Sequence, residues 1–407
     1  MPTDTTSKTK ATQRHSKVLT GLTAILVAGT LGACSHDPGP VDMAATEPIG
    51  RTSEHVRERL DAIVDAGYPA AIASVTVPGS DPIHVAAGVG NTNTGAAPPT
   101  DGEVRIASNT KMFVATVVMQ LVEEGLIALD APIDTYLPGL VEGQGIDGTA
   151  ITVRHLLQHT AGLPEYADKV AEDAFGAQNT YIAPRDLLDT ALAEPAVFAP
   201  GSSWEYSNTN YLVLGLLIER VTERVLAEQI DQRIVRPLGL QHTYLPNPGE
   251  RELRGPHADG YHADYPDDLR EISDLDPSFA WAAGAMVSTP SELGAFMKAL
   301  LFEGELVDDN SLAQMQNGVA SGDELYPEAK YGLGLQSYPL SCGGIAWGHG
   351  GDIPGTQTRN AVGPDGTAVT IAVTALPFAI VDSDDENTLI DYYRIVLDAL
   401  DATLCDR

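Results

Sequence analysis

The sequence predicts an α+β domain in which one antiparallel sheet is assembled from both ends of the chain and flanked by helices, with a mainly helical region inserted between the two sets of strands. Two β-rich runs, 70–77 and 84–89, lie early in the chain, and four more lie between residues 331 and 374. Residues 126–300 read mostly as helices and loops. A chain of 407 residues with 43% hydrophobic and 20% charged residues has enough apolar material for the large core that this arrangement needs.

The expected elements follow one another in a simple order. A helix over 53–66 precedes the two early strands, which turn around Pro78-Gly79-Ser80-Asp81. The next helix, over 108–124, repeats apolar residues at i+3 and i+4 spacing and is ended by Gly125. Further helices are expected over 153–158, 184–193, 208–227, 290–301 and 387–402, and further strands over 331–337, 345–349, 357–362 and 368–374.

Residues 1–33 carry the pattern of an export signal. Basic residues precede an apolar run over 18–31, which is shorter than the ~20 residues of a membrane span. The run ends in Leu31-Gly32-Ala33-Cys34, which resembles the lipobox of bacterial lipoproteins, where Cys34 would be lipidated and become the first mature residue. An ordinary signal peptide with a chance cysteine is the alternative. With a lipobox, 34–50 form a flexible tether, and 51–407 form a domain anchored to the extracytoplasmic face of the cell membrane.

The remaining cysteines, Cys342 and Cys405, predict a disulfide because the chain is expected to be exported. The bond would close a loop of about 63 residues and contribute roughly 4 kcal/mol to stability. It would also tie the last helix to the late strands. Two free buried thiols are the alternative.

Composition and motifs argue against several functional classes. The formal net charge is −32, from 56 acidic and 24 basic residues, whereas nucleic-acid binding needs clustered Lys and Arg. His155 and His159 share a helix face, but the glutamate of a His-Glu-x-x-His zinc site is missing between them. A Gly-x-Ser-x-Gly nucleophile elbow is missing as well. We therefore expect no metal, no cofactor and no nucleic-acid partner, and a monomer.

Ser108-Asn109-Thr110-Lys111 places a serine and a lysine on one helix face at the start of a predicted helix. A serine hydroxyl becomes a nucleophile when a base removes its proton, and a buried lysine can be that base. The N–H groups of the helix N-terminus favour the negative charge that develops at an attacked carbonyl. Alone this pattern is weak, because Ser7-Lys8-Thr9-Lys10 repeats it without catalytic meaning.

Two later motifs strengthen the prediction. Tyr206-Ser207-Asn208 lies just before an apolar helix, where the phenol can share the proton relay and the amide can hold the substrate or the lysine. His349-Gly350-Gly351-Asp352 lies on a predicted strand, where the glycines allow a substrate backbone to approach closely. Structural alternatives exist for each: Tyr206 packs and Asn208 caps a helix, or a glycine-rich strand end carries a stray histidine. Their order along the chain favours the catalytic interpretation.

Together these motifs resemble the serine β-lactamase and penicillin-binding-protein superfamily, and within it the secreted actinobacterial D-alanyl-D-alanine carboxypeptidases and the class C β-lactamase-like hydrolases. The likeness covers roughly residues 50–406. It includes the segments Leu156-Leu157-Gln158-His159-Thr160-Ala161-Gly162-Leu163, Ala283-Gly284-Ala285-Met286-Val287-Ser288 and Tyr331-Gly332-Leu333-Gly334-Leu335. A cysteine after Leu340-Ser341 and another at the far C-terminus also match the carboxypeptidase branch, which supports the disulfide.

The resemblance implies an acyl-enzyme mechanism and residue roles. Ser108 would attack a carbonyl while Lys111 and Tyr206 handle the proton, and Asn208 would contact the substrate amide and the lysine. His349 stands where most relatives have lysine and would protonate or position groups near Tyr206, with an ordinary pKa near 6.5. The backbone N–H groups of Ser108 and Asp352 would form the oxyanion hole beside Gly350 and Gly351. Expected substrates are peptidoglycan-derived or other small acyl compounds, with β-lactams as covalent ligands.

The sequence departs from the carboxypeptidase branch at two positions. Gly350 replaces a threonine, and Gln336 replaces an arginine that helps to hold the substrate carboxylate. Each lost charge-assisted hydrogen bond is worth roughly 1.5–3 kcal/mol, so we expect substrates without a free carboxylate to rival acyl-D-Ala-D-Ala. Phe279 and Trp281 are candidate pocket walls, with core packing as the alternative. The predicted function is that of a D-alanyl-D-alanine carboxypeptidase-like peptidase, with a β-lactamase, a carboxylesterase or a non-hydrolytic penicillin-binding sensor as alternatives.

Overall fold

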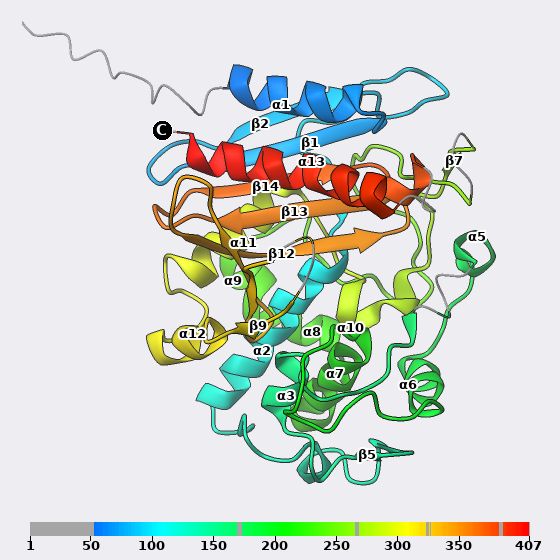
Figure 1. Cartoon of the computed structure of the whole chain (residues 1–407), viewed down its shortest axis with the longest axis vertical. Coiled ribbons are helices and arrows are strands. Elements are labelled where there is room, and N and C mark those ends of the chain that lie inside the picture. Colours follow the sequence, from blue (N-terminus) through cyan, green and yellow to red (C-terminus); the bar gives the residue numbers. More distant parts are fainter. Residues whose placement is uncertain are drawn as a thin grey trace, which may run out of the picture. The chain divides into compact units, whose positions relative to one another are not determined.

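The computed structural model describes residues 53–406 apart from 168, 170–172, 265–267, 323–324, 326 and 382–385. The predicted signal peptide, Cys34 and the whole of the predicted tether therefore lie outside the described residues. Eight antiparallel strands form the main sheet in the order β2-β1-β14-β13-β12-β11-β10-β9. The first strands of the domain thus pair with its last, because β1 lies beside β14 (Figure 1). The predicted fold class is confirmed.

The elements have the following bounds. The main sheet contains β1 (Ala70–Thr76), β2 (Ile83–Gly88), β9 (Val319–Ala320), β10 (Lys330–Tyr331), β11 (Gln336–Pro339), β12 (Ile345–Ile353), β13 (Thr356–Val362) and β14 (Ala368–Val373). Three short pairs are β3 (Val104–Arg105) with β8 (Val287–Ser288), β4 (Glu142–Gly143) with β5 (Ile146–Asp147), and β6 (Tyr261–His262) with β7 (Arg270–Glu271). The helices are α1 (Ser53–Asp65), α2 (Thr110–Glu123), α3 (Val153–Leu157), α5 (Ala174–Ala177), α6 (Pro184–Leu192), α7 (Asn208–Thr222), α8 (Leu226–Ile230), α9 (Arg236–Leu238), α10 (Trp281–Gly284), α11 (Pro290–Leu301), α12 (Asp309–Met315) and α13 (Glu386–Cys405).

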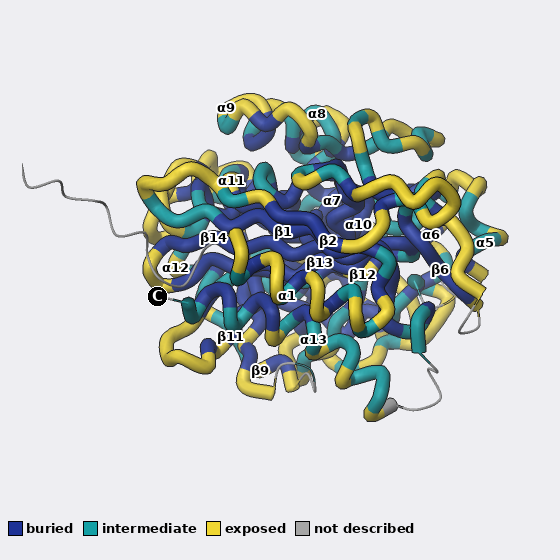
Figure 2. Tube along the Cα trace, turned by 90° about the horizontal axis from the view of Figure 1, so that it is seen from above, coloured by how far each residue is buried: buried dark blue, intermediate teal, exposed yellow. Residues whose placement is uncertain are grey.

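Helices cover both faces of the sheet. Helices α1 and α13 pack on one face, and α11 packs on the other, so that the strands form a buried middle layer (Figure 2). Every residue of β13 and β14 is buried, as expected for strands that are covered on both faces. The disulfide between Cys342 and Cys405 joins the turn after β11 to the end of α13, as predicted. No helix among the described residues is long and apolar enough to cross a membrane.

The inserted region is mainly helical and is built around α2. This helix is apolar on nearly every side, because α7, α8 and α10 surround it. The predicted helix over 208–227 is two helices, since Glu223 takes a left-handed φ of 56° and ends α7 before α8 begins. The predicted strand over 331–337 is interrupted by Gly334, whose φ of 74° and close approach to α2 exclude a side chain.

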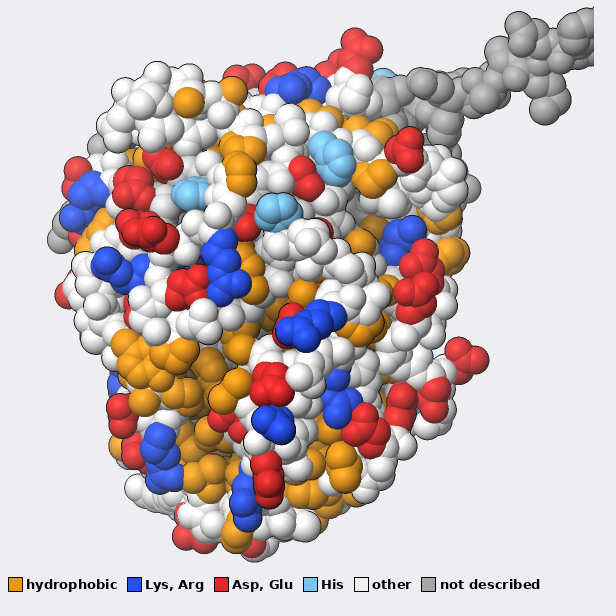
Figure 3. All heavy atoms as spheres, turned by 180° about the vertical axis from the view of Figure 1, so that it is seen from behind, with side chains coloured by type: hydrophobic (Ala, Val, Ile, Leu, Met, Phe, Trp, Pro, Cys, Tyr) orange, Lys and Arg blue, Asp and Glu red, His pale blue; other side chains and the backbone are white. Residues whose placement is uncertain are grey.

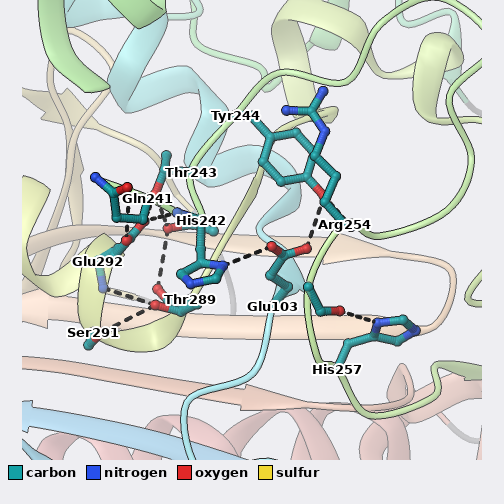
Figure 4. Close-up of polar contacts among 12 residues, drawn as sticks. Glu103, Gln241, His242, Thr243, Tyr244, Arg254, His257, Thr289, Ser291 and Glu292 are labelled. Atoms are coloured by element: carbon teal, nitrogen blue, oxygen red, sulfur yellow. Dashed lines mark hydrogen bonds and ion pairs between the residues drawn. The ribbon is translucent and has the colours of Figure 1, made fainter. Parts of the chain in front are cut away.

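A buried carboxylate anchors the segment that leads into the predicted nucleophile. Glu103, which is 2% exposed, lies just before β3 and receives hydrogen bonds from His242 and Tyr244, each at 3.0 Å (Figure 4). The neighbouring Thr243 donates a 2.7 Å hydrogen bond to Glu292 of α11. These contacts fix β3 and β8 to the helical region.

Candidate active site

Ser108 lies in a single 3-10 turn, Ala107–Asn109, between β3 and α2. Ala107 has a φ of 48°, a left-handed conformation that costs of order 1–3 kcal/mol in a residue with a side chain. The buried Asn109 holds the turn by donating hydrogen bonds to the Ile106 carbonyl and to Thr358 on β13. These hydrogen bonds fix the strained turn, and Ser108 with it, to the sheet.

Lys111 is fully buried and points at Ser108 from the first turn of α2. Its Nζ lies 3.0 Å from Ser108 Oγ, 2.8 Å from Asn208 Oδ1 and 2.7 Å from the Ala283 carbonyl oxygen. Burial lowers the pKa of Lys111 from 10.5 to about 7, although the charge of Glu165 partly opposes this shift. A substantial fraction of the lysine is therefore neutral near pH 7 and can accept a proton from Ser108.

Tyr206 and Asn208 come from the loop before α7 and the first residue of that helix. The Tyr206 ring lies over Lys111, with Nζ 4.8 Å from the ring centroid. Burial raises the pKa of Tyr206 well above 10, and a hydrogen bond with Ser108 partly offsets this rise, so the phenol is protonated. The structure thus brings Ser108, Lys111, Tyr206 and Asn208 together.

Glu165 orients Asn208 and is a site residue that the sequence analysis missed. Its Oε2 accepts hydrogen bonds from the Asn208 backbone N–H at 2.6 Å and from Nδ2 at 3.1 Å. Because Nδ2 is held by the carboxylate, the Asn208 amide presents Oδ1 to Lys111. Glu165 immediately follows Leu163-Pro164, just after the His159–Leu163 segment already noted, but nothing in that spacing indicates a contact with residue 208.

His349 lies on β12 and is only 3% exposed. Its Nδ1–H donates to the Gly350 carbonyl, and its Nε2 accepts a 2.8 Å hydrogen bond from Tyr331. Burial and the nearby Lys111 lower the pKa of His349 to about 3. The expectation that this histidine titrates near pH 6.5 is therefore wrong, because the ring is desolvated and stays neutral. Its ring centroid lies 6.2 Å from that of Tyr206.

The glycine-rich strand packs directly on the Ser108 turn. A side chain at Gly351 would come within 2.3 Å of the Ile106 carbonyl oxygen, so this position requires glycine. Asp352 follows, and its carboxylate is 40% exposed. It forms a bidentate ion pair with the buried Arg359, at 2.9 and 3.1 Å. Arg359 was also missed by the sequence analysis, because it reaches the site from β13 opposite Gly350.

Two cavities meet at Ser108, and Ser108, Asn208 and Asp352 line both. The first, of about 280 Å³, is polar; its other lining residues are Trp204, Tyr206, Leu325, Tyr331, Gln336, His349, Gly350 and Arg359. The second, of about 260 Å³, is more apolar; its aromatic lining residues are Tyr166, His262, Phe279, Phe378 and Tyr393. Phe279, a predicted pocket wall, lines the second cavity, and Gln336, which stands at the predicted carboxylate-binding position, lines the first. Trp281 lines neither of the two.

Trp281 lines a separate cavity of about 430 Å³, and its ring packs against Gly215 of α7. Figure 3 shows the molecule from behind, where hydrophobic side chains gather around a hollow in the surface. Trp281 therefore supports α10, which carries the Ala283 carbonyl that contacts Lys111.

Comparisons with known proteins agree with this geometry. Residues 53–393 match the sequence model of the Beta-lactamase family. A D-stereospecific amidohydrolase from Streptomyces sp. is 35% identical, with a TM-score of 0.73 over 84% of this chain and 98% of that one. A D-amino acid amidase from Ochrobactrum anthropi SV3, in complex with L-phenylalanine amide, is 26% identical, with a TM-score of 0.72 over 85% and 97%.

Two curated relatives are matched over shorter stretches. Esterase EstB of Burkholderia gladioli is 33% identical over 220 residues, which are 50% of this chain and 55% of that protein. Protein flp of Staphylococcus aureus is 32% identical over 148 residues, which are 36% of this chain and 28% of that protein. The matches thus span between about a quarter and about half of the length of these relatives. The family match across most of the chain shows that this protein belongs to the beta-lactamase family and is a serine hydrolase of that family.

Proposed function

We propose that the protein is an amidohydrolase that forms an acyl-enzyme at Ser108 from amides or short peptides of D-amino acids, and that it does not require a free carboxylate on the substrate. The observation that carries the catalytic part is the 3.0 Å contact between Ser108 Oγ and a buried Lys111 whose pKa is about 7. The D-amino acid part is supported by the likeness to the Streptomyces amidohydrolase, which extends over nearly all of that chain.

The reaction follows from the contacts around Ser108. Neutral Lys111 takes the hydroxyl proton as Oγ attacks the substrate carbonyl, and the backbone N–H groups of Ser108 and Asp352 stabilise the oxyanion. Tyr206 then passes a proton to the departing nitrogen while Lys111 restores the phenol proton, and the C–N bond breaks. Water attacks the resulting ester and gives its proton back through the same groups, which releases the acid and regenerates Ser108.

The position of the proton relay supports one assignment of the two cavities. The leaving group must lie beside Tyr206, and therefore in the polar cavity that this phenol lines. The acyl group then occupies the aromatic cavity on the other side of Ser108. A volume of about 260 Å³ between rings such as Phe279 and Phe378 suits a single bulky amino acid better than a long peptide.

The charges in the polar cavity disfavour a terminal carboxylate. Arg359 is the one Lys or Arg among its described lining residues, and Asp352 already neutralises this guanidinium with two hydrogen bonds. Gln336 offers an uncharged amide where the carboxypeptidase branch has arginine. A D-alanyl-D-alanine carboxypeptidase would therefore have to bind its substrate carboxylate without a free cation. For this reason we propose amides as substrates in preference to peptides with a free carboxylate.

Matched substrates test the proposal. We expect D-phenylalanine amide to be hydrolysed faster than L-phenylalanine amide and at least as fast as an acyl-D-Ala-D-Ala peptide. The Ser108→Ala variant is the blank, and a fluorophosphonate probe should label the parent enzyme and not this variant. A strong preference for the free-acid peptide would instead make the protein a carboxypeptidase. Rapid turnover of a short-chain ester with no amide turnover would favour the esterase that the likeness to EstB suggests.

A further inference from the structure

We propose that His159 is a positioning residue that fixes Tyr206 and Asn208 against Ser108 and thereby determines how well the site protonates an amide leaving group. This inference rests on the proposed function, since it concerns the relay described above. His159 lines neither of the cavities at Ser108. It therefore acts through other side chains and does not touch the substrate.

One ring nitrogen of His159 holds the chain on both sides of Asn208. Nδ1 accepts a 3.2 Å hydrogen bond from the Ser207 backbone N–H and a 3.0 Å hydrogen bond from Asn210 Nδ2. The two donors flank Asn208 at the start of α7. Because a single acceptor binds both, the first turn of α7 is fixed relative to His159, and with it the amide that contacts Lys111.

The face of the same imidazole supports the phenol. The His159 and Tyr206 ring centroids are 4.3 Å apart, and the ring planes are tilted by 30°. The imidazole also contacts Tyr331 edge-on, with 4.7 Å between the ring centroids. Tyr331 in turn forms a hydrogen bond with His349. The Tyr206 ring is thus in contact with both His159 and Lys111.

The cost of keeping His159 in this position points to a role beyond stability. Its φ is 59°, a left-handed conformation that is strained for a residue with a side chain. Because Nδ1 accepts, the proton is on Nε2, which is buried without a hydrogen-bond partner among the residues that the structure describes. Burial also lowers the pKa of His159 well below 6.5, so the ring stays neutral. Strain and an unsatisfied buried N–H together destabilise the fold, which is the pattern expected where positioning matters for function.

Two leaving groups distinguish positioning from a purely structural role. An amide nitrogen must be protonated as it departs and so depends on Tyr206, whereas p-nitrophenolate leaves without a proton. The experiment measures kcat/KM of the full chain for D-phenylalanine amide and for the p-nitrophenyl ester of the same acyl group. If His159 positions Tyr206, its loss must slow the amide more than the ester.

The main variant is His159→Asn, because asparagine tolerates a left-handed φ and keeps a hydrogen-bond acceptor but removes the ring. We expect its ratio of amide to ester activity to fall by about tenfold or more, a part of the 10²–10⁴-fold that a general acid contributes. Tyr206→Phe should change the ratio in the same direction. His159→Phe, which keeps a ring and loses the acceptor, provides a second test of the Nδ1 contacts and should also lower the ratio.

His155→Asn is the matched control, since His155 lies one turn earlier, on α3, where its ring accepts a hydrogen bond from the Thr152 backbone N–H. Its ratio should stay at the parent value. Thermal unfolding and fluorophosphonate labelling of Ser108 establish that each variant is folded. An unchanged ratio of amide to ester activity in His159→Asn, whether or not both activities fall, would overturn the positioning role. It would leave the proposed function intact. A parent enzyme that fails to label at Ser108 would overturn the proposed function itself.

Discussion

Lowering the pH from 7 to 5 is expected to slow acylation of Ser108 by about fiftyfold. Only neutral Lys111 can take the serine proton, and its pKa is about 7 because the ammonium is buried. About half of the lysine is neutral at pH 7 and about 1% at pH 5, which gives the fiftyfold ratio. Above pH 8 the rate should level off, since nearly all of the lysine is then neutral.

The assay is the pre-steady-state burst of p-nitrophenol from an activated ester, measured between pH 5 and 9. The burst reports acylation alone and is therefore independent of the later hydrolysis step. His349→Gln serves as the comparison, because a group with a pKa of about 3 cannot produce a transition near 7. The transition in the burst rate should persist in this variant.

Two results would refute this reasoning. A flat profile between pH 5 and 8 would show that Lys111 does not titrate in that range and that another group is the base. If the transition disappears in His349→Gln, then His349 and not Lys111 is the group whose ionisation sets the pH dependence. The second result would also mean that His349 is hydrated in solution, contrary to its 3% exposure and its hydrogen bond with Tyr331.

The same shift in the pKa of Lys111 predicts how its removal affects stability. Below pH 7 the lysine is protonated in both the folded and the unfolded chain, so the folded protein carries the full cost of a buried charge. Between pH 7 and 10.5 the unfolded chain retains a proton that the folded one has lost, so the unfolding free energy rises with pH, by about 1.4 kcal/mol per unit. The stability of Lys111→Met relative to the parent should therefore fall by roughly 2 kcal/mol between pH 7 and 9 in urea unfolding. A difference that stays constant with pH would contradict the depressed pKa.

Three further outcomes are expected. Glu165→Gln should move the acid limb of the burst profile to lower pH, because the carboxylate raises the pKa of Lys111; a limb that moves to higher pH would contradict this. Replacing Cys342 and Cys405 by serine should lower the unfolding free energy by roughly 4 kcal/mol, as judged by urea midpoints with the reduced parent as control. Glu103→Gln should cost about 1–3 kcal/mol in the same assay, because His242 and Tyr244 lose the charged acceptor that this buried carboxylate provides.

Local patterns predicted most of the fold, and long-range pairing limited the rest. Apolar runs over 70–77 and 368–374 identify strands that are buried in the sheet. Neither run indicates that the two strands are neighbours, because register is decided by contacts between residues about 300 positions apart. The break at Glu223 could not be predicted either, since a glutamate in a left-handed conformation is set by tertiary contacts and not by its own preference.

The site residues also separate into those that local sequence predicts and those that only the folded chain brings together. Ser108 and Lys111 are found because one helical turn places them together, whatever the rest of the chain does. Glu165 and His159 act on the Tyr206–Asn210 segment over separations of 43 to 51 residues, and only the folded loops bring them there. The pKa of His349 could not be predicted for a related reason, because the solution value applies to an exposed ring and this ring is buried.

The prediction that the site binds a substrate carboxylate weakly depends on two residues that come together only in the folded chain. In the sequence, Gln336 stands where the carboxypeptidase branch has the arginine that helps to hold the substrate carboxylate. The structure does supply a cation, since the antiparallel register of β12 and β13 brings Arg359 opposite Gly350. Two residues along β12 from Gly350, Asp352 pairs with both terminal nitrogens of that guanidinium. A carboxylate entering the cavity would have to displace an intramolecular one that is already held in place. Asp352→Asn should therefore improve turnover of free-acid peptides relative to amides, and an unchanged ratio in the substrate panel would show that Arg359 cannot reach the substrate.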